Sequence, residues 1–106
     1  MKTTITFRHM QPSEALKGYV NERLTKLDRY VRNSAEAHVI LNVEKSVHSA
    51  EVVVASKGVR AQGRLGTQDM YASIDGAIEK VEKTLKRHHD KRITAKSQAG
   101  KAVELL

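Results

Sequence analysis

The side chains with the clearest chemical role in this sequence are basic, and they recur at helical spacing. The two series are Arg23, Lys26 and Arg29, and then Lys80, Lys83, Lys86 and Arg87. Residues three or four positions apart neighbour each other on a helix surface, so each series predicts a cationic flank on a helix. Cationic side chains neutralise the phosphates of a nucleic-acid backbone, and both flanks are therefore candidate nucleic-acid contacts.

A solvated helix surface would explain the same charges. Carboxylates four residues away predict ion pairs within each helix, namely Glu79–Lys83, Glu82–Lys86, Glu22–Lys26 and Asp28–Arg32. The pattern of charge alone leaves both interpretations open. The chain carries 19 Lys+Arg against 12 Asp+Glu, a formal net charge of +7, and this excess in one small domain favours nucleic-acid binding.

Other kinds of chemistry find little support in the sequence. It contains no cysteine, which excludes disulfides, a thiolate nucleophile and cysteine-ligated metal sites. Adjacent helical residues diverge by about 100°, so His88 and His89 do not chelate one ion together. Helix capping and surface solvation explain the carboxylates of Asp69 and Asp75. We therefore expect a protein that is not an enzyme and that holds no metal or cofactor.

The elements that position the basic residues follow from hydrophobic periodicity. Alternating apolar residues predict four strands, and apolar stripes at helical period predict two helices; the strands are 3–9, 38–44, 50–54 and 59–65, and the helices are 13–32 and 69–90. The order is β-α-β-β-β-α, an α+β domain over residues 1–92. Periodicity fails beyond it, which predicts a mobile tail over residues 93–106.

The element order predicts how the layers are arranged. A strand-helix-strand connection makes the first two strands parallel, and both helices bury their stripes on one face of a four-stranded sheet. Gly63 on the core face indicates a helix packed close against the sheet. Lys57, Arg60 and Arg64 put positive charge on or beside the open face, but no aromatic residue accompanies them. Backbone recognition through the helices is thus favoured over base stacking on the sheet.

The sequence also predicts where the protein is found. Residues 1–10 contain no apolar run typical of a signal peptide, and no apolar stretch approaches the ~18 residues of a membrane span. We expect a cytoplasmic protein, monomeric when free, with no membrane partner.

Three stretches make the chain resemble a known family. The most specific is 68–76, Gln-Asp-Met-Tyr-Ala-Ser-Ile-Asp-Gly, followed by Lys80; the others are 19–30, which ends in Lys-Leu-Asp-Arg-Tyr, and 41–45, Leu-Asn-Val-Glu-Lys. Together they resemble the bacterial ribosome hibernation-promoting factor family, also called the ribosome-associated inhibitor or sigma-54 modulation family. The resemblance covers residues 1–92, and Ser73 departs from the alanine usual in the family.

The resemblance implies a fold similar to the double-stranded RNA-binding domain and a defined partner. Family members bind the small ribosomal subunit in the channel for messenger and transfer RNA, inhibit translation in stationary phase or stress, and stabilise idle ribosomes. The seven basic residues of the two series would contact ribosomal RNA, with ribosomal proteins nearby. The chain is similar to the short form of the family, which lacks the dimerisation domain.

Several alternatives stay open on the sequence. Short forms either help a separate dimerising factor to pair ribosomes or hold single ribosomes idle, and the tail at 93–106 is intermediate between the two types. The older family name suggests a protein-binding modulator of sigma-54-dependent transcription. A generic double-stranded RNA-binding module is a further interpretation.

Overall fold

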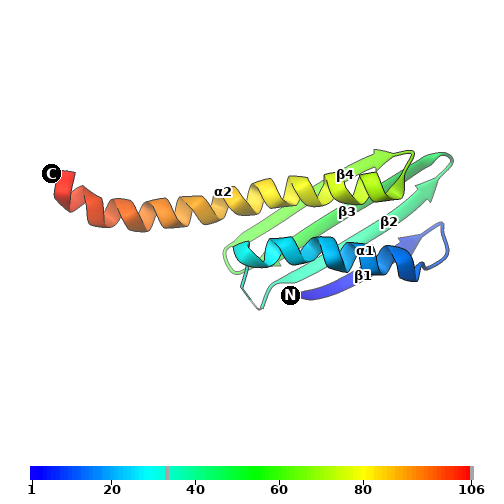
Figure 1. Ribbon diagram of the computed structural model, residues 1–106, viewed down its shortest axis with the longest axis horizontal. Helices are drawn as coiled ribbons and strands as arrows, with labels where there is room; N and C mark the ends of the chain where they lie inside the picture. The colour runs from blue at the N-terminus through cyan, green and yellow to red at the C-terminus, as the bar shows by residue number, and fades with distance from the viewer. Residues whose placement is uncertain (33, 106) are drawn as a thin grey trace.

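The computed structural model describes the backbone of residues 1–32 and 34–105, and the side chains of residues 1–32 and 34–91. The elements are β1 (Lys2–Arg8), α1 (Glu14–Leu24), the 3-10 helix η1 (Thr25–Tyr30), β2 (Glu36–Glu44), β3 (Val47–Ser56), β4 (Val59–Thr67) and α2 (Met70–Leu105). Figure 1 shows both helices running along the sheet and α2 continuing well beyond it. The predicted α+β class and the order β-α-β-β-β-α are confirmed.

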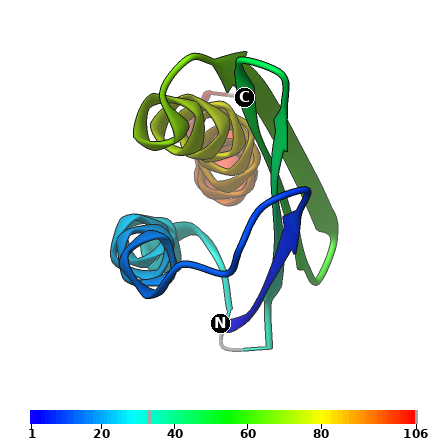
Figure 2. The same cartoon turned by 90° about the vertical axis from the view of Figure 1, so that its right-hand side faces the viewer.

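The sheet has the strand order β1-β2-β3-β4. β1 pairs with β2 in parallel, as predicted, and the other two pairings are antiparallel. Both helices lie side by side on one face, as the end-on view in Figure 2 shows, and the other face is open. Among the described residues, no helix is both long enough and apolar enough to span a lipid bilayer.

The core forms where the alternating strand residues meet the helix stripes. Val39, Leu41, Val52 and Val54 of the sheet are fully buried. They pack with residues of the helices, namely Leu16, Val20 and Leu24 of α1, Leu27 of η1, and Ile74, Ile78, Val81 and Leu85 of α2. Ser13 caps α1 as predicted, because its hydroxyl accepts a hydrogen bond from the Leu16 amide at 3.2 Å.

The first helix differs from the prediction. The sequence predicted one helix over 13–32, but α1 ends at Leu24 and the chain continues as η1 to Tyr30. In a 3-10 helix, residues three apart eclipse one another, so Leu27 stays in line with Leu24 and remains buried. The same spacing aligns Lys26 with Arg29 on the surface. A spacing of three suits both helix types, which is why the sequence pattern did not separate them.

The second helix is longer than predicted. It was expected over 69–90, yet it continues to Leu105, past the end of the apolar stripe. Residues 91–105 contain alanine, lysine, arginine, glutamine and glutamate, which favour a helix without help from a core. That the tail over 93–106 is mobile stays a prediction, and Leu106 lies outside the described residues.

The strand and helix directions give the body two different ends. At the β3–β4 end lie the β3–β4 turn, η1 and the first residues of β1 and β2. At the β2–β3 end lie the β2–β3 turn and the first residues of both helices (Figure 1). α2 therefore runs from the β2–β3 end to the β3–β4 end and leaves the body there.

Candidate nucleic-acid interface

Three elements on the helical side carry the seven basic residues predicted to bind RNA. α1 contributes one, η1 two and α2 four; in that order they are Arg23, then Lys26 and Arg29, then Lys80, Lys83, Lys86 and Arg87. Their surroundings differ strongly. Three of them hold partners within the protein, and the other four face solvent with no acidic partner among the side chains that the structure describes.

Arg23 belongs to a cluster that joins α1 to α2. Its Nε donates to Asp75 Oδ1 at 2.8 Å, and the Tyr19 hydroxyl donates to the same carboxylate at 2.7 Å. The hydrogen bond from Arg23 holds the pKa of Asp75 below its ordinary value, although partial burial opposes this effect. Hydrogen bonding to Asp75 raises the pKa of both Arg23 and Tyr19. The cluster ties the helices together and offsets the charge of Arg23.

Two further predicted residues also have partners on neighbouring elements. Lys26 Nζ lies 3.9 Å from Glu82 Oε1, so this pair joins η1 to α2. Lys80 Nζ donates to the carbonyl oxygen of Arg64 on β4 at 2.7 Å, which ties α2 to the edge of the sheet. Both lysines remain exposed and keep donors that are free to turn toward a ligand.

The predicted ion pairs within helices are wrong. Lys26 of η1 pairs with Glu82 of α2 rather than with Glu22 four residues earlier in the chain. Lys83 and Lys86 form no ion pair among the side chains that the structure describes. The acidic residues of α2 that meet α1 therefore neutralise the seam between the helices and leave the outer surface of α2 positive.

Four basic residues make up the unpaired part of the predicted set. Arg29, Lys83, Lys86 and Arg87 are exposed, and no carboxylate among residues 1–32 and 34–91 lies within the 4.0 Å of an ion pair. The guanidinium of Arg29 lies 5.3 Å from the ring centroid of Tyr30, and that ring contacts His89 of α2 edge-on at 5.8 Å. These contacts hold η1 beside α2 where the unpaired charges lie.

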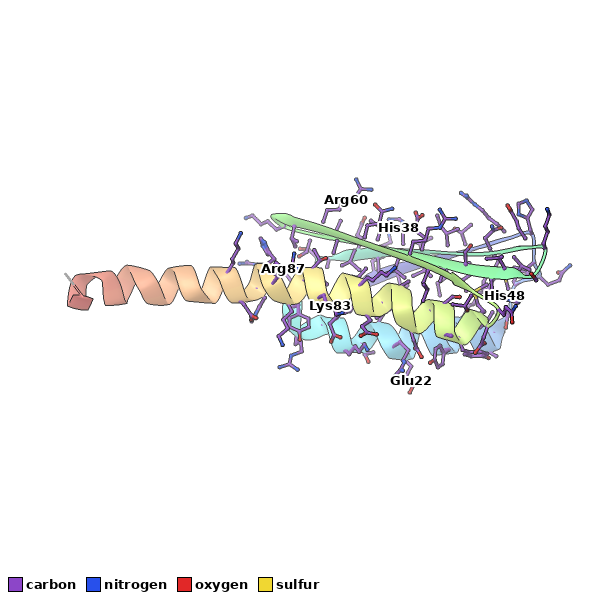
Figure 3. The ribbon with its side chains drawn as sticks, turned by 90° about the horizontal axis from the view of Figure 1, so that it is seen from above. Glu22, His38, His48, Arg60, Lys83 and Arg87 are labelled. Atoms are coloured by element: carbon purple, nitrogen blue, oxygen red, sulfur yellow. The ribbon has the colours of Figure 1, made fainter. Side chains whose placement is uncertain are left out.

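The helix period decides which way the α2 residues face. Lys83 lies opposite the buried stripe and points to solvent, since successive residues turn by about 100°. Lys80 and Arg87 are seven residues apart and share one side of the helix, the side on which Lys80 reaches β4. Figure 3 shows Lys83 and Arg87 on the part of α2 toward the β3–β4 end.

Basic residues gather at the β3–β4 end of the body. The cations there are Lys2, Lys26, Arg29, Arg32, Lys57, Arg60, Lys83, Lys86, Arg87 and Lys91, and the carboxylates are Asp28, Glu36, Glu82 and Asp90. The β2–β3 end holds fewer cations than carboxylates; the cations are Arg8, Lys17, Arg23, Lys45 and Arg64, and the carboxylates are Glu14, Glu22, Glu44, Glu51, Asp69 and Asp75. Lys80 and Glu79 lie between the two ends. The charge is thus polarised along the body, which the sequence pattern alone did not indicate.

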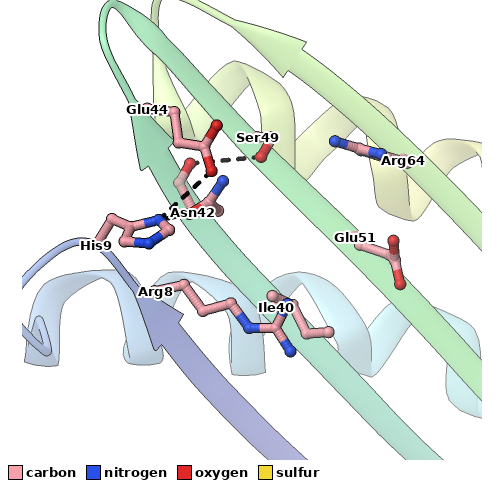
Figure 4. Close-up of a pocket in the computed structure, with 8 residues that line it drawn as sticks. All are labelled: Arg8, His9, Ile40, Asn42, Glu44, Ser49, Glu51 and Arg64. Carbon is pink, nitrogen blue, oxygen red and sulfur yellow. Dashed lines mark hydrogen bonds and ion pairs between the residues drawn. The ribbon is translucent and has the colours of Figure 1, made fainter.

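The open face of the sheet carries a shallow hollow of about 190 Å³ near the β2–β3 end. His9 Nδ1 lies 2.8 Å from Asn42 Oδ1 and 3.5 Å from Glu44 Oε1, as Figure 4 shows. The side chains of His9 and Glu44 are both 65% exposed, so water screens this pair. The hollow alternates charges of both signs and shows no buried acid–base pair of the kind that general catalysis uses.

The histidines near the end of the described α2 side chains do not converge. His89 packs against Tyr30 and lies 3.8 Å from Asp90, while His88 is one residue away around the helix. In the described part of the chain, no three histidine, aspartate or glutamate residues are grouped to hold a metal ion.

Sequence reasoning missed the acidic partners. Asp75 and Glu82 neutralise basic residues that lie far away in the sequence, and only the packing of α1 against α2 brings them together. No spacing within one helix signals such a pair. Tyr19, whose hydroxyl completes the Asp75 cluster, was likewise not singled out by its position.

Comparison with known proteins gives a consistent result. Residues 3–93 match the family model described as Sigma 54 modulation protein / S30EA ribosomal protein. A ribosome hibernation promoting factor from Salmonella typhimurium is 35% identical over 91 residues, which cover 86% of this chain and 96% of that protein. The crystal structure of the Thermus thermophilus Protein Y N-terminal domain superposes with a TM-score of 0.76 at 28% identity, covering 83% of this chain and 99% of that one.

A ribosomal subunit interface protein from Coxiella burnetii has the same fold. It superposes with a TM-score of 0.72 at 20% identity, and the match covers 83% of this chain and 97% of that one.

Proposed function

Because this chain belongs to the Sigma 54 modulation protein / S30EA ribosomal protein family, we propose that it is a ribosome hibernation factor of the bacterial cytoplasm. In this proposal it binds the small ribosomal subunit in the channel for messenger and transfer RNA. It thereby inhibits translation in stationary phase or stress and stabilises idle ribosomes. The name of its Salmonella relative supports the hibernation role.

The unpaired cations Arg29, Lys83, Lys86 and Arg87 are the observation that carries the proposal. They are exposed on adjoining elements and face away from the core. An ammonium or guanidinium group that has no acidic partner keeps its full charge for an RNA phosphate. Arg23, Lys26 and Lys80 complete the proposed RNA-binding set but contribute less, because each already holds a partner within the protein.

The mechanism is occlusion and needs no covalent step. A folded domain occupies space that messenger and transfer RNA require, and its cations hold it on the ribosomal RNA backbone. With about five phosphates neutralised, the logarithm of affinity should fall with the logarithm of salt at a slope near −3.5 to −4.5. A fourfold rise in salt would then weaken binding about a hundredfold or more.

The test reverses the charges of two unpaired cations of α2, Lys83 and Arg87. The double variant Lys83→Glu/Arg87→Glu should no longer sediment with small subunits in a sucrose gradient, while its thermal midpoint stays close to that of the wild type. Surface substitutions of this kind change stability by less than ~0.5 kcal/mol.

A matched control carries the same change in charge at the other end of the body. Arg8→Glu/Lys45→Glu reverses one arginine and one lysine that are both exposed near the β2–β3 end. It should keep sedimenting with small subunits. If the Lys83/Arg87 variant also keeps sedimenting, the assignment of the RNA-binding surface is wrong. A wild-type protein that purifies with RNA polymerase and not with ribosomes would contradict the hibernation role.

A further inference from the structure

Two cations at the β3–β4 end lie outside the proposed RNA-binding set and belong to β4 and to the turn that precedes it. β3 ends at Ser56 and β4 begins at Val59, so Lys57 lies in the tight turn between them, beside Gly58 with its positive φ of 84°. Arg60 pairs in register with Ala55 and points to the open face of the sheet. Both side chains are exposed.

The packing of α2 on β4 determines which part of α2 lies beside Lys57 and Arg60. A Cβ on Gly63 would collide with the carbonyl oxygen of Ala77 and would lie 2.9 Å from Lys80 Cβ, so the helix crosses the strand in close contact there. The hydrogen bond from Lys80 to the Arg64 carbonyl joins helix and strand at the same place. Gly63 is therefore a common origin for measuring along both elements.

From that origin, both elements run toward the β3–β4 end. Arg87 lies seven residues beyond Lys80, which is about 10 Å along a helix axis. Arg60 lies three residues before Gly63, which is also about 10 Å along a strand. Both residues thus lie on the β3–β4 side of this crossing, Arg87 on the β4 side of α2 and Arg60 on the open face. Figure 3 shows both toward this end of the body, with Arg60 on the side of the sheet away from the helices.

Lys57 and Arg60 form no ion pair with the side chains that the structure describes. No carboxylate among residues 1–32 and 34–91 lies within ion-pair distance of either side chain. The in-register neighbour of Arg60 is Ala55, which carries no charge. No phenylalanine, tyrosine or tryptophan of the described residues lies on the open face, because Phe7 points to the core and the tyrosines belong to α1, η1 and α2. A ligand here would meet charge without a stacking platform.

We infer that Lys57 and Arg60 extend the RNA-binding surface around the β4 edge, from the outer side of α2 onto the open face of the sheet. This inference rests on the proposed ribosome binding and adds to it a second set of phosphate contacts. The ligand is RNA backbone, since the phosphates carry the negative charge that attracts unpaired cations and receive most protein–nucleic acid hydrogen bonds. The protein would then enter the RNA with its β3–β4 end foremost, and backbone would lie against both faces of that end.

The test reverses the two sheet cations in the full-length protein. Lys57→Glu/Arg60→Glu should bind purified small subunits at least tenfold more weakly than the wild type. The slope of log affinity against log salt should become shallower by about 2, since each lost phosphate contact removes about 1. The control Arg8→Glu/Lys45→Glu has the same change in net charge and should keep the wild-type slope and affinity within about threefold.

The possible outcomes separate this inference from the proposed function. If the wild type fails to bind small subunits, the proposed function is wrong. If the wild type binds and Lys57→Glu/Arg60→Glu binds equally well, only the sheet contacts are wrong. Equal weakening by the test pair and the control would indicate a general effect of net charge and would also overturn the inference. Weaker binding with an unchanged salt slope would point to a ribosomal protein as the contact and would overturn the assignment to phosphate.

Discussion

At the scale of single residues, the Asp75 carboxylate binds one member of the predicted basic series, Arg23, and gives it a structural role. Arg23 belongs to a cationic flank in the sequence, yet in the structure its Nε is bound to Asp75 and its ring neighbour is Tyr19 at 5.5 Å. Tyr19 in turn contacts Tyr71 edge-on at 4.8 Å. Arg23 therefore has a structural role at the seam, and its contribution to RNA binding should be smaller than that of Lys83.

The Asp75 cluster predicts a pH dependence of stability. The folded-state pKa of Asp75 is lower than its ordinary value of 3.8, chiefly because Arg23 donates a hydrogen bond to it. A lowered carboxyl pKa gives stability that is fully present above the ordinary value and is lost as the pH falls through the folded value. Asp75→Asn should lower the thermal midpoint by a few degrees at neutral pH, and the difference from wild type should shrink below about pH 4.

Thermal melts of both proteins from pH 7 to pH 3 measure this dependence. Glu79→Gln serves as the control, because Glu79 lies on the same helix and forms no ion pair with the side chains described here. Its midpoint should follow the wild type across the range. A gap between Asp75→Asn and wild type that stays constant down to pH 3 would contradict the proposed role of the carboxylate.

At the scale of elements, α2 is fixed to the sheet by close contacts at two of its buried turns. Ser73 is fully buried, and its hydroxyl donates to the His48 carbonyl at 2.6 Å. An alanine, which the family resemblance leads one to expect at this position, would lack this bond. Farther along, Gly63 lets the backbone of α2 approach β4. The direction in which Lys80, Lys83 and Arg87 point depends on these contacts.

Two glycine substitutions should have opposite effects on stability. Gly63→Ala would press a methyl group against the backbone of Ala77, and overpacking of this kind costs about 1–3 kcal/mol. In a domain of this size each kcal/mol lowers the thermal midpoint by roughly 4–8 °C. Gly18→Ala adds a methyl group in the middle of α1 with no atom within 4 Å, and should gain about 0.5–1 kcal/mol.

Thermal or urea unfolding of the two variants measures both changes in stability. A Gly63→Ala protein as stable as the wild type would mean that α2 does not lie as close to β4 as Gly63 indicates. Ribosome binding by Gly63→Ala should also weaken, because a displaced α2 would shift Arg87 relative to the start of β4.

The periodicity of the sequence was sufficient to predict these elements but not their details. Alternating residues located all four strands, the Ser56–Val59 turn and the close approach at Gly63. The change from α1 to η1 was missed because Leu24 and Leu27 suit either helix type. The extension of α2 was missed because it depends on local helix propensity and not on an apolar stripe.

At the scale of the whole molecule, the candidate site could be predicted only in part. The unpaired cations of α2 follow from spacing and charge in the sequence. The packing of α2 against α1 and η1 determines which cations are neutralised. The antiparallel run of α2 along β4 brings most of the cations to one end of the body. The electrostatic field of a polyanion attracts the cationic end of the protein and so orients the protein as it approaches.

The whole-molecule arrangement also predicts that residues 1–92 form an independent folding unit. Every member of the described buried core precedes Arg92, and the last of them along the chain is Leu85. A fragment of residues 1–92 should therefore unfold within about 2 °C of the full chain, since stability resides in the buried core. It should still bind small subunits, because all proposed RNA-binding residues are retained.

A fragment of residues 1–84 is the matched comparison: it loses fully buried Leu85 and should be less stable by about 2 kcal/mol or more. Calorimetry and gradient sedimentation of the three proteins would show this order, and a 1–92 fragment that unfolds or fails to bind would place an essential contact beyond residue 92.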